Sequence, residues 1–262
     1  RVLFRSIEFK IENNIGWLTL NRPEVFNSFN REMALRLQDN LDSCENNPEI
    51  RAIVITGNGK AFCAGQDLKE VTTPDLNPGF KKILEEHYNP IVSRIRKIEK
   101  PIIAAVNGIA AGAGANIALA CDVVVASESA GFIQAFSKIG LIPDSAGTFF
   151  LPRLIGLQKA SALMMLGDKV SADEAEKMGM IYKVFGVEEF ETEVRKLAET
   201  MAKMPTKALG MTKQLLNRSL SNDLNTQLDF ESKLQIEAAQ SEDYLEGVNA
   251  FVEKRKPIFR GK

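Results

Sequence analysis

Two short runs of purely apolar residues constrain the fold of this chain more than any other feature of its sequence. Residues 102–106 (IIAAV) and 123–126 (VVVA) contain no polar side chain. A strand reads as a continuous apolar run when both of its faces are covered, so we expect two buried strands here. Residues 51–56 add a third short buried strand, which ends at a Gly-Asn-Gly turn. These strands alternate with segments of helical spacing, which predicts an α/β fold.

The N-terminal part of the chain shows a hairpin pattern and then a helix start. Residues 7–12 alternate apolar and polar side chains, and an Asn-Asn-Ile-Gly segment separates them from a second apolar run. This arrangement is typical of a β-hairpin. Asn30 is a residue type that caps helices, and apolar residues follow it at helical spacing up to Cys44.

The remaining elements follow from glycine, proline and apolar spacing. Residues 71–79 are rich in Thr, Pro, Asp and Asn and predict a mobile loop, followed by a helix over 80–97. Residues 108–120 are rich in Gly and Ala and then apolar, which predicts a closely packed helix. After Gly140 the strand content falls, and helices are predicted at 160–166, 172–178, 188–201, 206–216, 223–239 and 243–254.

Three segments are expected along the chain. Residues 7–200 would form an α/β core that carries the site, and residues 201–262 a helical C-terminal region. One DNA spelling of residues 1–6, RVLFRS, matches the end of a common sequencing adapter. We therefore expect these six residues to be non-native and leave them out of the fold prediction.

The charge, cysteine and histidine counts exclude several classes of protein. Lys plus Arg number 33 and Asp plus Glu 34, a net charge of −1 that argues against a broad basic surface for nucleic acid. No stretch approaches the ~18 consecutive apolar residues of a membrane-spanning helix. Three scattered cysteines fit a reducing cytosol, so a cytoplasmic location is expected. His87 is the single histidine, which argues against a poly-histidine metal site.

The first candidate site segment is residues 60–68, KAFCAGQDL, which follows a buried strand. Ala64 and Gly65 would let a ligand approach the backbone closely. The functional interpretation is a turn whose main-chain N–H groups face a bound group. The alternative is an ordinary tight turn from strand to helix, with Cys63 as a small filler without a basic neighbour beyond Lys60.

The second candidate segment is residues 107–116, where four small residues from Gly112 to Ala115 open a helix. Free N–H groups at the start of a helix attract developing negative charge. The segment lacks the Gly-Lys-Ser/Thr of a phosphate-binding P-loop. The alternative interpretation is close packing between helices through small side chains.

The third candidate is Asp144, which lies among apolar residues that include Phe132 and Phe136. Burial of a carboxylate raises its pKa above the usual ~3.9 and suits it to general acid–base work. The alternative is a helix cap, because Pro-Asp-Ser-Ala-Gly is a common helix entrance. His87, in Glu-Glu-His-Tyr, is expected on a solvated helix face, and the basic residues near the C-terminus are expected to be solvated.

Taken together, these segments resemble the crotonase (enoyl-CoA hydratase/isomerase) superfamily over essentially the whole chain from Ile7. The residues that carry the resemblance are Asn21-Arg-Pro-Glu, AFCAGQDL at 61–68, the block at 106–122, the block at 140–151 and EGVNAFVEKR at 246–255. The resemblance implies a spiral of ββα units that forms two roughly perpendicular sheets, with C-terminal helices that build homotrimers, often paired into hexamers. It implies acyl-CoA substrates and no separate cofactor or metal, since the CoA arrives on the substrate.

The resemblance also implies functional positions in this sequence. The main-chain N–H groups of Gln66 and Ala113 would form an oxyanion hole for the thioester carbonyl. The substrate would be contacted at Val25, Ala64, Asp67, Leu68, Gly112, Phe136 and Pro143.

The catalytic carboxylates distinguish the branches of the superfamily. Its hydratases use two glutamates, at positions that read Asn116 and Phe136 here, and neither residue can act as a base. Asp144 remains, in a context similar to the ring 1,2-epoxyphenylacetyl-CoA isomerases of phenylacetate breakdown. The expected reaction is therefore isomerisation through an enolate, of a ring epoxide to an oxepin thioester or of a 3-enoyl-CoA to a 2-enoyl-CoA.

Two other functions remain open at this point. One is an enoyl-CoA hydratase of fatty-acid oxidation, against which the missing glutamates argue. The other is a crotonase-fold binding protein with weak catalysis, against which the intact oxyanion segments argue. A shift of the melting temperature with CoA thioesters would test for the binding site itself.

Overall fold

The computed structural model describes residues 6–262. Most of the segment expected to be adapter-derived therefore lies outside the described residues. Ser6 is described and buried, and its Oγ donates to Glu32 Oε1 at 2.9 Å.

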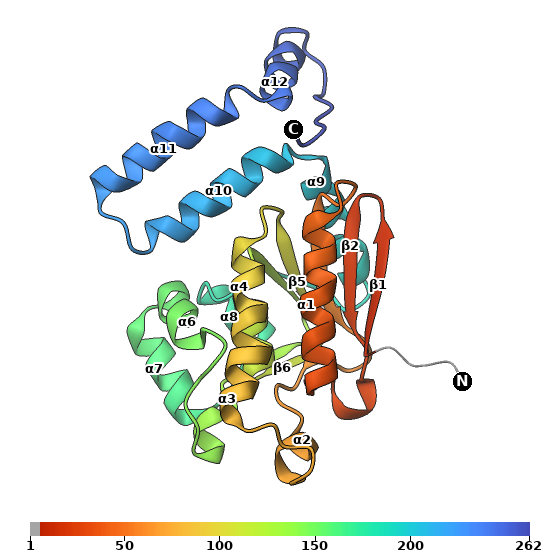
Figure 1. The fold of residues 1–262 in the computed structure, drawn as a ribbon, viewed down its shortest axis with the longest axis vertical. Coiled ribbons are helices and arrows are strands. Elements are labelled where there is room, and N and C mark those ends of the chain that lie inside the picture. Colours follow the sequence, from red (N-terminus) through yellow and green to blue (C-terminus); the bar gives the residue numbers. More distant parts are fainter. Residues whose placement is uncertain (1–5) are drawn as a thin grey trace.

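The predicted buried strands lie in the middle of a six-stranded sheet (Figure 1). The strand order is β1-β2-β3-β5-β7-β10, and only the β1–β2 pair is antiparallel. The bounds are β1 Ile7–Glu12, β2 Ile15–Leu20, β3 Ala52–Gly57, β5 Ile102–Val106, β7 Val123–Ser127 and β10 Lys183–Phe185. The predicted hairpin is confirmed, and Asn13 and Asn14 form its turn with φ of 53° and 63°.

A second sheet of four strands carries the site segments. Its order is β4 (Ala61–Cys63), β6 (Ile109–Ala111), β8 (Gly131–Ile133) and β9 (Lys169–Ser171). The prediction of one helix over 108–120 is wrong, because β6 comes first and helix α5 begins at Ala113. The reason is pairing. β6 lies between β4 and β8, so closely that a Cβ on Gly108 would meet the Lys60 carbonyl oxygen at 2.2 Å.

Helices cover both faces of the larger sheet. Inside β5, Ile102 and Ala104 pack in the larger core cluster, which α1, α4 and α5 complete. Ile103 and Ala105 pack in the second cluster, against α9. Successive side chains of a strand point to opposite faces, and this is why the strand reads as an unbroken apolar run.

The predicted helices are present with modified ends. Asn30 caps α1, since its side chain accepts from Met33 N at 3.0 Å. The helix predicted over 80–97 contains a π-helical turn, η2, and the loop expected from residue 71 begins after α2. The bounds are η1 Pro23–Val25, α1 Arg31–Asn46, α2 Leu68–Thr72, α3 Phe80–Lys82, η2 Ile83–Tyr88, α4 Asn89–Lys97, α5 Ala113–Leu119, η3 Ala135–Ile139, α6 Gly147–Ile155, α7 Leu157–Leu166, α8 Ala172–Lys177, α9 Phe190–Lys203, α10 Thr206–Ser219, α11 Leu224–Ala238 and α12 Glu242–Val252.

The last three helices, α10, α11 and α12, lie outside the two sheets (Figure 1). Helix α10 is fastened to the core by Lys213, whose Nζ lies 2.8 Å from Asp122 Oδ2, and Arg96 holds the other oxygen at 3.0 Å. Helix α11 has no buried residue. Within residues 6–262, no helix combines the length and apolar character needed to cross a membrane.

Candidate active site

The turn between β4 and α2 presents a main-chain N–H group at Gln66. Phe29 pairs with the residues on either side, since its N–H donates to Gly65 O at 2.7 Å and its carbonyl accepts from Asp67 N at 2.8 Å. In a parallel bridge the residue between the two bonded neighbours directs its own N–H away. Among the described residues, no acceptor lies in hydrogen-bond range of the Gln66 N–H.

The second predicted N–H donor, at Ala113, lies beside this turn. Ala113 is the first residue of α5, and its N–H has no hydrogen-bond acceptor within residues 6–262. Gly65 has a φ of +92°, and a Cβ there would lie 3.0 Å from Ala111 O and 3.5 Å from Ala113 N. The fold therefore brings the two predicted oxyanion segments into direct contact, and glycine at position 65 permits the approach.

The side chain of Gln66 is held at both ends. Tyr88 Oη donates to Gln66 Oε1 at 2.8 Å, and Gln66 Nε2 donates to Glu70 Oε2 at 2.7 Å. The other Glu70 oxygen accepts from Arg31 N at 2.7 Å. Tyr88 is buried, with its ring edge-on to Phe29 at 6.0 Å. The peptide that carries the Gln66 N–H is thus fixed through its side chain as well as its backbone.

Sequence analysis missed Tyr88 and Glu70 as members of the site. Burial raises the pKa of Tyr88 well above its usual value, and the charges of Cys63 and Asp144 add to the effect. The phenol therefore stays protonated and acts as a donor. Tyr88 reaches Gln66 from η2, 22 residues along the chain, so no local pattern marks it. Glu70 lies only four residues after Gln66, on the first turn of α2, and this i, i+4 spacing is a signal that the sequence does contain.

The predicted acid–base residue, Asp144, is not a helix cap. Helix α6 begins after Ala146, whose backbone is left-handed, and no side chain caps it. The Asp144 carboxylate accepts from Ser145 Oγ at 2.9 Å. Burial raises the pKa of Asp144 to about 6, although the serine hydroxyl lowers it. Its charge also raises the pKa of Tyr88, so the carboxylate lies within electrostatic range of the phenol that holds Gln66.

The two positions at which the family resemblance places the hydratase glutamates hold uncharged side chains, and both side chains already have close neighbours. Asn116 is fully buried, accepts from Gln134 Nε2 at 2.8 Å and donates from Nδ2 to Asp144 O at 2.8 Å. Phe136 is buried, and its ring lies 3.7 Å from where a Cβ on Gly112 would be. The structure therefore places Gly112 and Phe136 side by side, and their contact with substrate stays a prediction.

The other predicted substrate contacts surround the turn at Gln66 or lie near Asp144. Asp67 is buried, caps α2 and forms an ion pair with Arg22 at 2.8 Å, so its carboxylate shapes the turn. Ala64 is exposed, and its N–H donates to Phe26 O at 2.9 Å, which brings η1 with Val25 to the turn. Leu68 is exposed at the start of α2, and Pro143 lines a cavity of about 390 Å³ with Leu141 and Ile142.

The expectation for His87 is wrong. The histidine is only 1% exposed, and its Nε2 lies 3.1 Å from an Arg31 guanidinium nitrogen. Burial lowers the pKa of His87, with a further decrease from Arg31 that Glu70 and Glu86 oppose. The charged neighbours in the sequence suggested a solvated face, but η2 turns this side chain toward α1. The interpretation of Cys63 as filler is consistent with its full burial, which raises its pKa to about 12.

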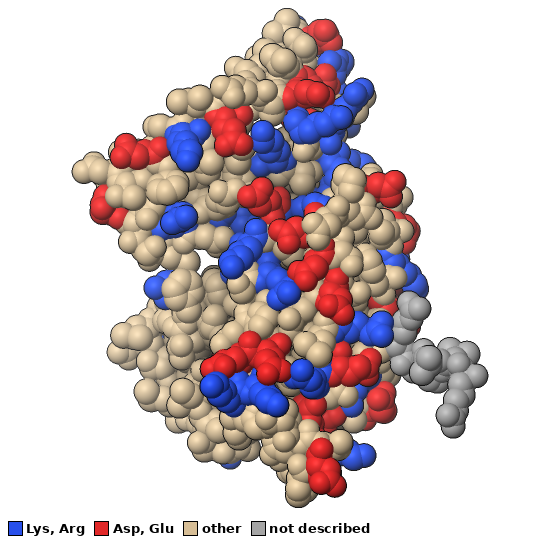
Figure 2. Space-filling view, in the orientation of Figure 1, with Lys and Arg blue, Asp and Glu red and all other residues tan. Residues whose placement is uncertain are grey.

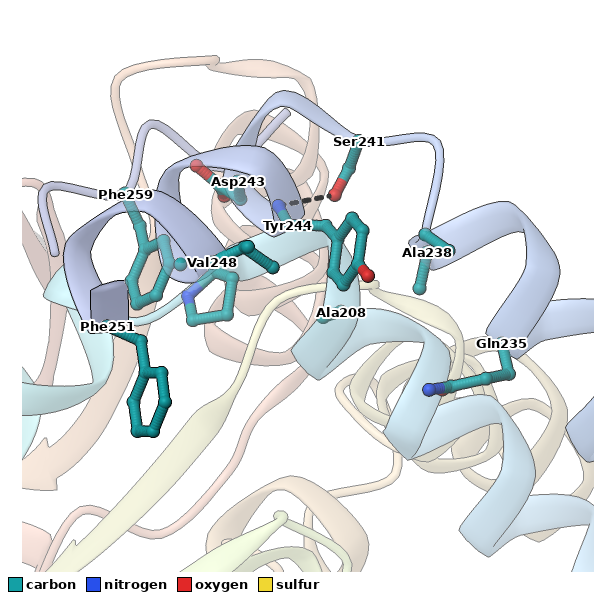
Figure 3. A pocket seen from close by; sticks show the side chains of 12 residues that line it. Ala208, Gln235, Ala238, Ser241, Asp243, Tyr244, Val248, Phe251 and Phe259 are labelled. Carbon is teal, nitrogen blue, oxygen red and sulfur yellow. Dashed lines mark hydrogen bonds between the residues drawn. The ribbon is translucent and has the colours of Figure 1, made fainter. Parts of the chain in front are cut away.

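A larger cavity, of about 480 Å³, lies away from this site among α10, α11 and α12 (Figure 3). Ala208, Ala238, Tyr244 and Val248 line it, and the Tyr244 N–H donates to Ser241 Oγ at 3.1 Å. Gln66, Ala113 and Asp144 take no part in it. Within residues 6–262, no group of three His, Cys, Asp or Glu side chains could hold a metal ion.

Comparisons with known proteins identify the family of the chain. The sequence model of the enoyl-CoA hydratase/isomerase family matches residues 10–262. The 1,2-epoxyphenylacetyl-CoA isomerase of Escherichia coli strain K12 is 46% identical over 254 residues, 96% of this chain and 97% of that protein. The short-chain-enoyl-CoA hydratase of Clostridium acetobutylicum is 35% identical over 94% of each chain.

A solved structure extends the agreement to three dimensions. The crystal structure of the enoyl-CoA hydratase of Bacillus anthracis matches with a TM-score of 0.91 at 32% identity, over 98% of this chain and 100% of that one. Agreement of this kind over nearly the whole chain establishes both fold and family. The chain therefore belongs to the enoyl-CoA hydratase/isomerase family and has the crotonase fold.

Proposed function

We propose that this enzyme isomerises acyl-CoA thioesters with Asp144 as its single acid–base residue. The observation that carries the proposal is the place of Asp144: its main-chain oxygen accepts at 2.8 Å from Asn116 on α5, the helix that begins with the Ala113 donor. Burial raises the pKa of its carboxylate to about 6. A pKa near the working pH suits a group that must both take and return a proton.

The proposed mechanism uses two main-chain donors and one carboxylate. The N–H groups of Gln66 and Ala113 bind the thioester oxygen and stabilise the negative charge that forms on it. One such donor is worth about 2.7–4 kcal/mol in the transition state. Asp144 removes a proton next to the carbonyl to form the enolate and returns it at another carbon. No water is consumed, so a second carboxylate is not required.

The substrate class that we propose first is the ring 1,2-epoxide of phenylacetyl-CoA, with a seven-membered oxepin thioester as product. In this conversion the carbon–carbon bond shared by the epoxide and the six-membered ring breaks, which expands the ring without a change of formula, and Asp144 moves one proton from the carbon next to the thioester to a ring carbon. The support is the 46% identity to a protein named 1,2-epoxyphenylacetyl-CoA isomerase. The same groups would convert a 3-enoyl-CoA to the conjugated 2-enoyl-CoA, because this reaction needs only a proton transfer on an enolate. We therefore keep both substrates within one proposal.

Hydration of a 2-enoyl-CoA is the second candidate, favoured by the relatives named hydratases. Water addition needs one group to activate water and one to protonate the α-carbon. Asn116 and Phe136 cannot do this, since neither side chain is an acid or a base, and both ends of the Asn116 amide already make a hydrogen bond. We expect hydration to be slow.

The decisive experiment compares three substrates on the wild-type enzyme and on Asp144→Asn. We expect isomerisation of the ring epoxide or of a 3-enoyl-CoA to fall by about 10²–10⁴-fold in the variant. Hydration of a 2-enoyl-CoA, measured in parallel, should be slow in both. Full isomerase activity in Asp144→Asn would refute the mechanism, and rapid hydration by the wild type would refute the reaction class.

A further inference from the structure

The buried side-chain amide of Asn116 links the helix that carries Ala113 to the turn that carries Asp144. Helix α5 carries Ala113 at its first position and Asn116 three residues later. Residues at this spacing lie on the same face of a helix. From there the Nδ2 of Asn116 reaches the main-chain oxygen of Asp144 at 2.8 Å. One helical turn therefore separates the oxyanion donor from the contact that holds the acid–base residue.

The contact with Asp144 falls where the backbone is strained. Ser145 and Ala146, which follow, have φ of 50° and 60°, in the left-handed region that non-glycine residues rarely adopt. Such a conformation persists when its surroundings hold it in place. The Asp144 carbonyl accepts from both Asn116 Nδ2 and Gly147 N, the latter at 2.9 Å.

Gly147 shows how tightly Asn116 fits beneath this turn. A Cβ on Gly147 would lie 2.3 Å from Asn116 Nδ2, so only glycine admits the amide. Gln134, 5% exposed, donates from Nε2 to Asn116 Oδ1 at 2.8 Å. Because this bond takes the Oδ1 end, the Nδ2 end faces the Asp144 carbonyl, and the orientation of the amide is set by its partners.

We propose that Asn116 is a positioning residue that fixes the Asp144 carboxylate relative to the oxyanion hole. The inference rests on the proposed isomerase function and deepens it. Asn116 acts through the peptide of Asp144, with Gln134 orienting its amide. A displacement of about 1 Å between reacting groups can lower the rate by about 10²-fold. The hydrogen bond from Asn116 to Asp144 can therefore affect the rate although Asn116 does not touch the substrate.

The test replaces Asn116 by Leu, which has a similar size but no donor. We expect kcat for the isomerisation to fall by about 10²-fold, with KM changed less than about threefold, because the CoA contacts are retained. The released Asp144 turn would also admit water to the carboxylate. The apparent pKa in the pH profile of kcat/KM should then fall from about 6 toward the usual value of an aspartate.

A second variant and a control complete the design. Gln134→Met removes the donor that orients Asn116 and leaves Asn116 itself unchanged. We therefore expect kcat and the apparent pKa to fall in the same direction as in Asn116→Leu, but by less. This variant carries the test if Asn116→Leu does not fold. Asn46→Leu makes the matched change on the exposed face of α1, where the amide donates only to Asp42 O, and should leave kcat and the pH profile unaltered.

The outcomes separate the two proposals. If Asp144→Asn retains full isomerase activity, the proposed function itself is refuted. If Asp144→Asn is inactive while Asn116→Leu keeps the wild-type kcat, the positioning role alone is refuted. A lowered kcat with an unchanged pH profile would also refute it, because loss of folded enzyme lowers the rate without moving the pKa of Asp144.

Discussion

Asp144 is a costly residue for the fold, and the cost has a definite pH dependence. Burial raises its pKa from 3.8 to about 6, so the folded state binds the proton more tightly than the unfolded chain does. Stability then falls as the pH rises from about 4 to about 6 and stays lower above that. A residue that lowers the stability of the folded protein is typical of a functional site.

We therefore expect Asp144→Asn to be more stable than the wild type above pH 6. The shift of about two pKa units corresponds to at most about 3 kcal/mol, and we expect about 2 kcal/mol at pH 8. Denaturant titrations at several pH values would measure the gap, which should narrow toward pH 4. A gap that widens toward acid pH would contradict the burial of this carboxylate.

The pH dependence of the rate tests the same group in its working role. Asp144 must be ionised to remove a proton, so kcat/KM should fall about tenfold per pH unit below about pH 6 and level off above it. Steady-state rates with a 3-enoyl-CoA across the acid range would measure this. A profile that is flat down to about pH 5 would exclude Asp144 as the base.

At this scale the sequence points to the residues proposed to act on the substrate more readily than to the residues that support them. Asp144 stands out because a carboxylate among apolar residues is unusual. Gln66 and Ala113 follow from small-residue segments and a family resemblance. Tyr88 and the use of Asn116 depend on contacts between distant segments, which leave no mark on any local pattern.

Among the elements, the turn between β4 and α2 shows how closely two segments must approach to form the site. Gly65 has both a left-handed φ and a near neighbour, Ala111 O, at 3.0 Å from a hypothetical Cβ. Gly79 has a similar φ of +84° and open space around it. A comparison of the two positions separates the effect of a positive φ, which both have, from the effect of the close approach to Ala111, which only Gly65 makes.

We expect both Gly65→Ala and Gly79→Ala to lower the stability, because an L side chain rarely adopts the positive φ at either position. Activity should fall at least tenfold in Gly65→Ala alone, because its Cβ displaces the Gln66 N–H from the Ala113 N–H. Thermal unfolding and isomerase assays on both variants would measure these effects. Equal activities would show that the close approach at Gly65 is not required.

The elements themselves could be predicted where they are long or fully covered. The strands β3, β5 and β7 and helix α1 match their patterns because burial on one or both faces sets the spacing. The strand β6 could not be predicted, since three residues are too short for a period. Its two alanines and the glycines that flank it serve the pairing with β4 and β8, which the sequence alone does not reveal.

At the scale of the whole molecule, exposed apolar residues gather in two places. Helices α11 and α12 expose Leu224, Ile236, Phe251 and Val252, and Phe251 is 85% exposed. In Figure 2 the side of the molecule formed by α6 and α7 carries few charged atoms compared with the rest of that face. Apolar patches of this kind mark surfaces that other molecules cover.

We propose that copies of this chain cover the C-terminal patch, in a homotrimer or a hexamer of two trimers. The mass in solution should then be about three or six times 29.0 kDa by light scattering. Phe251→Glu should lower it to a single chain, because it places a charge in the apolar contact. The matched change Asn46→Glu, on α1, should leave the mass as it is. A wild-type monomer would refute the assembly.

The reactivity of the three buried cysteines can be used to measure local opening of the fold. Cys44 lies in α1, Cys63 at the end of β4 before the turn at Gln66, and Cys121 after α5, and burial raises each thiol pKa to about 12. A thiol reagent can modify each one only when its surroundings open. A bound acyl-CoA should slow the labelling of Cys63 most, so the rates at three thiols, read by mass spectrometry, would map which part of the enzyme the substrate holds closed.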